Sequence, residues 1–176
     1  LLTLNSNSQP GVMSEITTVG VLGCGLMGSG IAQISAAAGF TTVVREVSDE
    51  LLAKGKGAIT GSLNKLVEKG KLDSAARDAT LGRLRFSTRV ADLKDCDIVI
   101  EAVVEDLETK NAMWKELDAL CPSHTVFASN TSSLTIAAMA ATTKRADKFV
   151  GLHFFNPVPL MKLVEVVRTV TTSKET

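Results

Sequence analysis

The sequence predicts an α/β fold built on a doubly wound, mostly parallel sheet. Short β-branched segments alternate with longer helical segments along the 176 residues, and glycines or capping residues separate the two kinds. Hydrophobic residues make up 45% of the chain and charged residues 22%, the balance of a soluble globular protein. A chain of this length can form one domain whose core is stable without disulfides or metal.

Six elements are expected in the first half of the chain. They are strands over 17–22, 41–45 and 84–88, helices over 26–38 and 48–69, and a short helix that begins at Asp73. The first two strands are β-branched runs, and the third is weak. Gly39 and Gly70 would end the first two helices, because glycine readily adopts the left-handed conformation of a helix C-terminus. Ser48 and Asp73 are typical N-caps for the second and third helices.

Six further elements are expected in the second half. They are strands over 97–103, 125–128, 149–154 and 163–167 and helices over 106–120 and 135–141. The longer helix carries apolar residues at 107, 113, 114, 117 and 120, which lie on one helix face. Ser132 and Ser133 precede the last helix, and we expect Ser133 to be its N-cap. Strands that alternate with helices in this way form βαβ units and a mostly parallel sheet.

Composition excludes several classes of function. The 19 basic and 19 acidic residues give a net charge of zero, so the chain carries no electrostatic footprint for nucleic acid or an anionic membrane. No apolar run approaches the length of a bilayer span. The sequence contains no Tyr, which excludes a phenol as general acid. Cys24, Cys96 and Cys121 are too widely spaced for a disulfide framework or structural zinc, so no metal site is expected.

A glycine motif follows the first expected strand and opens the first helix. Its residues are Gly23, Cys24, Gly25, Leu26, Met27 and Gly28, the pattern G-x-G-x-x-G. Gly23 permits a tight turn, Gly25 lets a pyrophosphate approach the backbone, and Gly28 lets the helix pack close to the strand. The unpaired N–H groups of the helix N-terminus would then face the phosphates. In this position the motif predicts a Rossmann-type fold that binds a dinucleotide.

Glu46 ends the second strand of this βαβ unit, 18 residues after Gly28. An acidic residue there can hydrogen-bond the hydroxyls of the adenine ribose, and its charge would repel a 2′-phosphate. The position therefore favours NAD over NADP, although the neighbouring Arg45 could pair with that phosphate. The alternative is a glycine-rich turn without a ligand, followed by a surface Glu.

If a nicotinamide binds, the reaction needs a base near its ring, and histidine suits that role near neutral pH. His124 lies in a helix-to-strand turn and is expected to be a solvated loop residue. His153 lies at the end of an expected strand, where open α/β sheets bind their ligands. Glu165 follows 12 residues later on the next strand and could hold the imidazole, unless the two form a purely structural pair.

Residues 129–133 form a polar cluster, SNTSS, just past another expected strand. Their hydroxyl and amide groups could donate hydrogen bonds to a substrate carbonyl. They could equally cap the helix that follows.

Four segments together resemble a known family: GCGLMGSGIAQ, DIVIEAVVEDLETK, FASNTSSL and GLHFFNPVPLMKLVEVV. Residues 16–176 are similar to the NAD-binding domain of the L-3-hydroxyacyl-CoA dehydrogenases, which include the short-chain 3-hydroxybutyryl-CoA enzymes. The resemblance implies NAD-dependent oxidation of (3S)-3-hydroxyacyl-CoA to 3-oxoacyl-CoA, or the reverse reduction, in fatty-acid (β-oxidation) or butanoate metabolism.

The resemblance also implies roles for individual residues. His153 would be the general acid and base, Glu165 its partner, and Ser132 a contact of both substrate and nicotinamide. The glycine motif and Glu46 would hold the adenosine half of NAD, where the family usually has Asp. Further positions are implied near the cofactor, namely Glu105, Lys110 and Asn156, and against coenzyme A, namely Ser62 and Lys69. On a helix, Lys69 could otherwise be a solvated surface charge.

The resemblance leads to an expected domain organisation. Residues 1–14 would be a disordered leader or an added tail, residues 15–170 the NAD-binding domain, and residues 171–176 the start of a linker. Family members carry a second, helical C-terminal domain that closes the cleft and forms most of the dimer contact. We therefore expect this chain to be the cofactor-binding fragment of a homodimeric enzyme. The expected location is the cytoplasm, or the mitochondrial matrix in a eukaryote.

Two other functions stay open at this point. A related dehydrogenase of the same family could act on a sugar acid with similar motifs. The chain could also be an NAD-binding module without catalysis. The β-hydroxyacid dehydrogenases have a similar glycine loop but rely on a Lys in place of the HFFNP segment, which makes them a poorer match.

Overall fold

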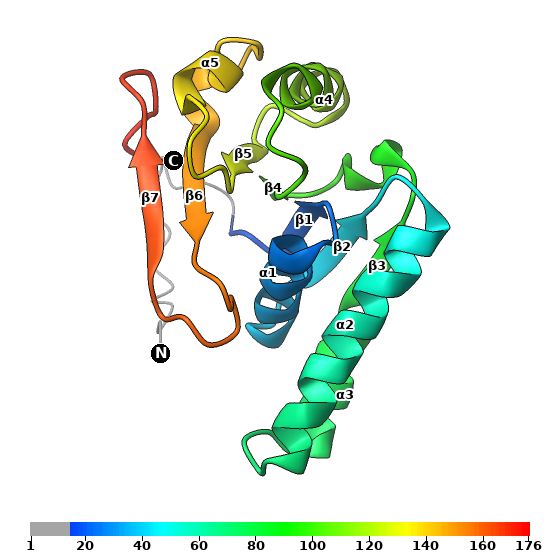
Figure 1. Ribbon diagram of the computed structural model, residues 1–176. Coiled ribbons are helices and arrows are strands. Elements are labelled where there is room, and N and C mark those ends of the chain that lie inside the picture. Colours follow the sequence, from blue (N-terminus) through cyan, green and yellow to red (C-terminus); the bar gives the residue numbers. More distant parts are fainter. Residues whose placement is uncertain (1–14) are drawn as a thin grey trace.

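Helices pack on both faces of one sheet, which confirms the predicted doubly wound α/β fold (Figure 1). The computed structural model describes residues 15–176, and the leader expected at residues 1–14 lies outside them. The sheet has seven strands in the order β3-β2-β1-β4-β5-β6-β7. Neighbouring strands are parallel except for β7, which pairs antiparallel with β6 at one edge. The strand order reverses between β1 and β4, and open α/β sheets bind ligands at such a point.

The strands agree closely with those expected from the sequence. They are β1 (Thr18–Leu22), β2 (Thr41–Arg45), β3 (Leu84–Ser87), β4 (Ile98–Glu101), β5 (Val126–Ser129), β6 (Phe149–Phe154) and β7 (Val164–Arg168). The largest difference is at β4, which is shorter than the expected 97–103. The carboxylate of Asp97 accepts hydrogen bonds from the backbone N–H groups of Thr17 and Thr18. The N–H of Val103 donates to the side chain of Glu101, so the chain leaves the sheet after this residue.

The helices are α1 (Leu26–Ala37), α2 (Asp49–Glu68), α3 (Ser74–Gly82), α4 (Leu107–Leu120) and α5 (Ile136–Ala140). The predicted N-caps of α2 and α3 are confirmed. Ser48 accepts a hydrogen bond from the N–H of Leu51 at 3.3 Å, and Asp73 accepts one from Ala76 at 2.7 Å. Two short 3₁₀ turns, η1 (Val90–Leu93) and η2 (Ala146–Lys148), are not predicted by the sequence patterns.

The predicted N-cap of α5 is wrong. Thr135, and not Ser133, occupies that position, and its side chain makes no capping hydrogen bond. The N–H groups of Ser133 and Leu134 instead donate to the hydroxyl of Thr131, at 3.3 and 3.0 Å. The hydroxyl of Thr131 thus closes the turn before the helix, and Ser133 is not needed as a cap.

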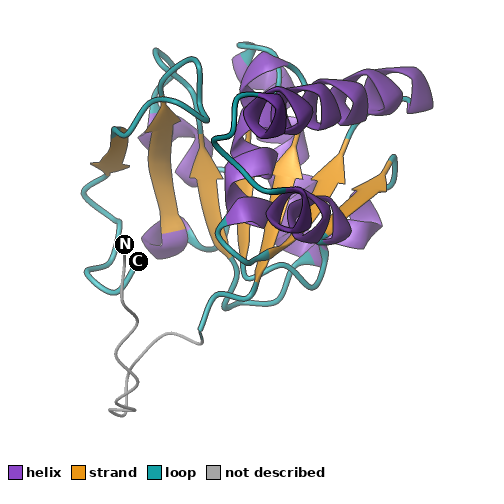
Figure 2. Ribbon diagram, turned by 90° about the horizontal axis from the view of Figure 1, so that it is seen from below, coloured by secondary structure: helices purple, strands orange, loops and turns teal. Residues whose placement is uncertain are grey.

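Two apolar cores attach the helices to the sheet, one on each face (Figure 2). The first packs α1 and α2 against the strands through residues such as Ile31, Ile59 and Leu63. The second lies under α4 and α5, where the ring centroids of Trp114 and Phe127 are 5.0 Å apart. Because both faces are covered, the central strands are apolar and buried along most of their length.

The three cysteines are free and buried. Burial raises the pKa of the Cys24 thiol to about 11 and that of Cys96 to about 12, so both thiols stay protonated at neutral pH.

In the part of the chain that the structure describes, no helix is both long enough and apolar enough to cross a membrane.

Candidate active site

The glycine motif forms the turn between β1 and α1, and the geometry of this turn requires two of its glycines. Gly23 has a φ of +88°, in the left-handed region that favours glycine. A Cβ built on Gly28 would lie 1.9 Å from the carbonyl oxygen of Gly23, so no side chain fits where the helix passes the turn. The N–H of Gly23 donates to the carbonyl oxygen of Arg45 at 2.9 Å, which fixes the turn to β2.

Gly25 differs from these two because the space beside it is open. A Cβ built on it would meet no atom within 4 Å. Gly25 is also the N-cap of α1, and no side chain caps the N–H groups of the first turn. The helix therefore offers unpaired donors and the positive end of its dipole to an anion. A dinucleotide pyrophosphate needs this arrangement, so the residues present fit the predicted cofactor.

Glu46 lies beside this turn, directly after β2. Its Oε1 accepts a hydrogen bond from the N–H of Cys24 at 2.7 Å, and its Oε2 accepts one from Val47 at 2.8 Å. A carboxylate can accept about four hydrogen bonds, so acceptor positions remain for the hydroxyls of a ribose. Glu46 lines a cavity of about 370 Å³ between the glycine turn and α2. The Nε of Arg45 donates to the carbonyl oxygen of Thr88 at 3.4 Å.

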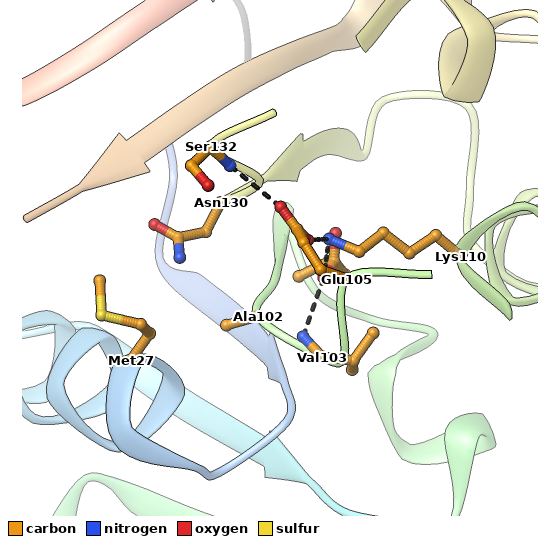
Figure 3. Close-up of a pocket in the computed structure, with 8 residues that line it drawn as sticks. Met27, Ala102, Val103, Glu105, Lys110, Asn130 and Ser132 are labelled. Carbon is orange, nitrogen blue, oxygen red and sulfur yellow. Dashed lines mark hydrogen bonds and ion pairs between the residues drawn. The ribbon is translucent and has the colours of Figure 1, made fainter. Parts of the chain in front are cut away.

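A second cavity, of about 200 Å³, lies at the carboxyl ends of β4 and β5 (Figure 3). Its lining comes from α1 and from the segments that follow the two strands: Met27, Glu101, Ala102, Val103, Glu105, Lys110, Asn130 and Ser132. Four residues of the predicted site meet here, namely Met27, Glu105, Lys110 and Ser132. The cavity therefore joins the glycine turn to the polar cluster that follows β5.

Two carboxylates and one ammonium form an ionic cluster at this cavity. The Nζ of Lys110 lies 3.0 Å from the Oε1 of Glu101 and 2.5 Å from the Oε2 of Glu105. The Oε1 of Glu105 accepts hydrogen bonds from the hydroxyl of Thr131 and from the N–H of Ser132. Partial burial opposes ionisation of Glu105, but the hydrogen bonds from Lys110 and Thr131 outweigh it and hold the pKa of the carboxyl below its usual value.

His153 in β6 lies directly opposite Glu165 in β7. The Nδ1 of His153 is 2.8 Å from the Oε2 of Glu165. Because an ionised carboxylate only accepts hydrogen bonds, the neutral imidazole carries its proton on Nδ1 in this contact and has its lone pair on Nε2. The histidine ring also packs against Phe155, with the ring centroids 4.7 Å apart. The side chain of His153 is 23% exposed, so a ligand can approach it.

Asn130 connects the second cavity with the strand that carries the histidine. Its side chain lines the cavity, and its Oδ1 accepts a hydrogen bond from the N–H of Phe154 at 2.8 Å. His153 and Glu165 are not among the residues that line this cavity. The histidine pair and the cavity are therefore neighbouring parts of one sheet edge, fixed to each other through Asn130.

Three further predicted site residues, Asn156, Ser62 and Lys69, line neither cavity and belong to neither the glycine turn nor the histidine pair. Asn156 is exposed in the segment between β6 and β7. Ser62 lies on α2, which runs away from the sheet edge, and Lys69 is exposed at the C-terminal end of that helix (Figure 1). His124, expected to be a solvated loop residue, is exposed and lies 3.5 Å from the carboxylate of Asp97.

Two polar residues of the second cavity, Glu101 and Asn130, are not singled out by any sequence pattern. Glu101 is the last residue of β4 and is fully buried. An acidic residue that ends an apolar strand could have indicated a site, because α/β sheets bind ligands at the carboxyl ends of their strands. Asn130 is visible in the sequence only as one member of the polar cluster 129–133.

The fold and the site together define a class, a Rossmann-type domain with a histidine–carboxylate pair at the ligand-binding edge of its sheet. The family follows from comparison with known proteins. Residues 18–176 match the family described as "3-hydroxyacyl-CoA dehydrogenase, NAD binding domain". The chain belongs to this family.

Individual relatives agree with the family match. Over 157 residues the chain is 50% identical to a probable 3-hydroxybutyryl-CoA dehydrogenase of Deinococcus radiodurans. The match covers 89% of this chain and 56% of the relative. Over 180 residues it is 44% identical to the mitochondrial hydroxyacyl-coenzyme A dehydrogenase of Homo sapiens, which covers 99% of this chain and 56% of the relative. The chain thus spans about half the length of the curated relatives it matches.

A solved structure gives the same result for the fold. The (S)-3-hydroxybutyryl-CoA dehydrogenase of Ralstonia eutropha superposes with a TM-score of 0.89 at 45% sequence identity. The superposition covers 91% of this chain and 56% of that one.

Proposed function

We propose that the protein containing this chain catalyses NAD-dependent oxidation of (3S)-3-hydroxyacyl-CoA to 3-oxoacyl-CoA, and the reverse reduction. The observation that carries the proposal is the contact of 2.8 Å between the Nδ1 of His153 and the Oε2 of Glu165. It leaves Nε2 free to act as a base at the edge of a sheet that belongs to an NAD-binding family. The names of the relatives, which are hydroxyacyl-CoA and hydroxybutyryl-CoA dehydrogenases, support the substrate class.

His153 moves the proton in this reaction. During oxidation its Nε2 takes the proton of the C3 hydroxyl, while bound NAD supplies the acceptor for the hydride that leaves C3. The carboxylate of Glu165 stabilises the imidazolium that forms and keeps the ring in the tautomer with a free Nε2. During reduction the imidazolium returns its proton to the C3 oxygen.

The other residues of the site bind and orient the two reactants. Ser132, whose N–H is held by Glu105 at 3.1 Å, contacts the C3 oxygen of the substrate and the nicotinamide. The glycine turn and Glu46 hold the adenosine half of NAD. Further contacts are assigned to the cofactor through Glu105, Lys110 and Asn156, and to coenzyme A through Ser62 and Lys69.

The proposal extends to the organisation of the enzyme. Residues 15–170 form the NAD-binding unit, and residues 171–176 begin the linker to a helical domain that completes the cleft and the homodimer. The family resemblance supports this arrangement, and so does the length of the relatives, of which the chain covers 56%. The buried free thiols of Cys24, Cys96 and Cys121 support a reducing compartment, the cytoplasm or the mitochondrial matrix.

An NAD-binding module without catalysis is the alternative. It is favoured by the exposure of the Glu165 side chain, which at 53% leaves the histidine pair accessible to water. Removal of water strengthens electrostatic interactions in an active site, so an open pair is a weaker catalyst than a covered one.

Two measurements on the full-length protein separate these functions. Fluorescence titration with NADH tests binding, and the loss of NADH absorbance in the presence of acetoacetyl-CoA tests turnover. Binding with turnover supports the proposal, whereas binding without turnover supports the module. Turnover of sugar acids and not of acetoacetyl-CoA would assign the protein to a different substrate class. If the protein neither binds NADH nor turns over any of these substrates, the dehydrogenase function is contradicted.

A further inference from the structure

The ionic cluster at the second cavity contains a residue that the proposed mechanism does not use. Glu101 ends β4, and its side chain is 0% exposed. Its carboxylate is contacted by the N–H of Val103 at 2.8 Å, the hydroxyl of Ser129 at 2.5 Å and the Nζ of Lys110 at 3.0 Å. A buried carboxylate is costly unless it is paired and hydrogen-bonded in this way. Two strands, a loop and a helix therefore converge on a single charge.

Packing alone does not explain why this position is charged. The two residues before it in β4, Val99 and Ile100, are apolar and buried. Replacement of a buried ion pair by well-packed apolar residues is often neutral or stabilising, so stability alone is a weak reason for the ion pair between positions 101 and 110. The charge lies at the carboxyl edge of the sheet, where ligands bind. Its position therefore points to a role in the site.

Lys110 is the residue through which Glu101 can act. Its side chain is only 1% exposed and lines the cavity between the two carboxylates (Figure 3). An ammonium has three N–H donors. One donates to Glu105, and Glu101 lies 3.0 Å away as an ion pair, so at least one donor remains for a ligand. The side chain of Glu105 is 40% exposed and belongs to a loop. Glu101 is held on a strand by two further hydrogen bonds and is the fixed member of the pair.

We propose that Glu101 is a positioning residue, which anchors the ammonium of Lys110 at the cavity wall so that its free N–H meets the dinucleotide. The inference rests on the proposed function, because it takes this cavity as part of the cofactor site. Lys110 also pairs with Glu105, whose carboxylate accepts a hydrogen bond from the N–H of Ser132 at 3.1 Å. Glu101 thus orders a cofactor contact and, more indirectly, a substrate contact.

The test compares Glu101→Gln, Lys110→Met and the double variant in the full-length protein, with the Kd for NADH measured by fluorescence titration. Glu101→Gln keeps the shape of the side chain, and Lys110→Met keeps its apolar stem. Each single change should raise the Kd on the order of 10-fold, the effect of one lost charge-assisted hydrogen bond. The double variant should bind no more than about twofold more weakly than Lys110→Met, because Glu101 then has nothing to position.

Glu108→Gln is the matched control, since Glu108 is exposed in the first turn of the same helix and does not contact the cluster. Its Kd should change less than about twofold. Thermal melts of all variants report stability separately from binding.

Two results would overturn the proposal. In the first, the Kd of the double variant rises by the product of the two single-variant increases, so the two residues act independently. In the second, the Glu101→Gln protein is less stable but binds NADH with the Kd of wild type. If Glu101→Gln does not fold, Ser129→Ala provides the test because it removes only one hydrogen bond to Glu101. Its Kd should rise about threefold, and an unchanged Kd would overturn the proposal. Wild-type protein that binds NADH without turnover contradicts the proposed function and leaves this test intact.

Discussion

The two ends of the ligand-binding edge are built from different chemical groups, backbone at one end and side chains at the other. At β1 and α1 the site consists of backbone: a turn at Gly23, open donors at Gly25, and a helix that passes the turn at Gly28 without room for a methyl group. At β6 and β7 the site consists of two side chains, His153 and Glu165, on an edge where all five residues of β7 are exposed.

This difference determines how each end responds to substitution. A site made of backbone depends on steric fit, so one added methyl group can change its shape. A site made of side chains can lose its chemistry while the fold stays intact. We therefore expect changes in the glycine turn to affect cofactor binding and stability, and changes in the histidine pair to affect turnover.

The largest effect is expected from His153→Gln, which removes the base and keeps a polar side chain. The kcat for reduction of acetoacetyl-CoA should fall about 1,000-fold, because a positioned acid is replaced by solvent. The Kd for NADH should stay within about twofold of wild type, since the glycine turn is untouched. Steady-state kinetics and fluorescence titration of the full-length protein measure the two quantities.

The second histidine supplies the control for this variant. His124 is exposed, lies 3.5 Å from the carboxylate of Asp97 and lines neither cavity. His124→Gln should leave kcat unchanged. A loss of less than about tenfold in His153→Gln would contradict its role as the base, because general acid–base catalysis contributes more than that.

Gly28→Ala should show the opposite pattern, a loss of stability and binding. Its Cβ would lie 1.9 Å from the carbonyl oxygen of Gly23, so either the helix or the turn must move. We expect the free energy of unfolding to fall by about 3 kcal/mol, the upper range for an overpacked site. NADH should bind at least about tenfold more weakly, because the helix N-terminus shifts away from the phosphates. Urea unfolding and NADH titration check the two effects.

Gly57→Ala is the matched glycine in the middle of α2, where an added Cβ would meet no atom within 4 Å. This variant should be more stable than wild type by about 0.5–1 kcal/mol, because alanine favours a helix over glycine. Equal destabilisation of the two variants would show that the close approach at Gly28 has no special role. The contrast between binding and turnover would then lose its structural basis.

Glu46→Gln should produce a smaller change, confined to cofactor choice. The amide oxygen can still accept the hydrogen bond from the N–H of Cys24, but the negative charge beside the ribose is lost. The preference for NADH over NADPH should decrease about tenfold, because the charge no longer repels a 2′-phosphate. Glu50→Gln, exposed in the first turn of α2, is the control and should leave the preference unchanged. An unaltered preference in Glu46→Gln would place the adenine ribose elsewhere.

The glycine turn is also the part of the site that the sequence predicts best. The expected bounds of β1, α1 and β2 differ from the observed ones by at most one residue. Glycines and β-branched runs determine local conformation, and the pairing of β1 with β2 needs only the short connection through α1. The position of Glu46 beside the turn follows from this same local unit.

The second cavity could not be predicted in this way. Glu101 and Lys110 meet because β4 ends at Glu101 and the chain turns into α4 at a particular angle, and no periodic pattern encodes that turn. The wrong N-cap at Ser133 has a related cause. Thr131 closes that turn, and its hydroxyl is fixed by Glu105, 26 residues earlier in the chain. In both cases a tertiary contact between side chains of different segments decides the outcome.

The smallest effect is expected where the two ends of the site meet, at Glu105. Burial opposes ionisation of this carboxyl, but hydrogen bonds from Lys110 and Thr131 bring its pKa below the ordinary value of 4.5. Because the pKa of Glu105 is lower in the folded than in the unfolded protein, its ionised carboxylate contributes its full stabilisation above about pH 4.5. This contribution is lost as the pH falls through the folded-state pKa. Wild type should therefore melt at a higher temperature than Glu105→Gln at neutral pH, and the two melting temperatures should converge in acid.

Thermal melts from about pH 7 to about pH 3 check this convergence. Glu108→Gln, on the exposed side of α4, controls for the loss of one negative charge from the helix. A difference between wild type and Glu105→Gln that persists or widens in acid would mean that the cluster does not favour the ionised carboxylate. The connection from Lys110 through Glu105 to Ser132 would then not depend on charge, and the two ends of the site would be coupled by packing alone.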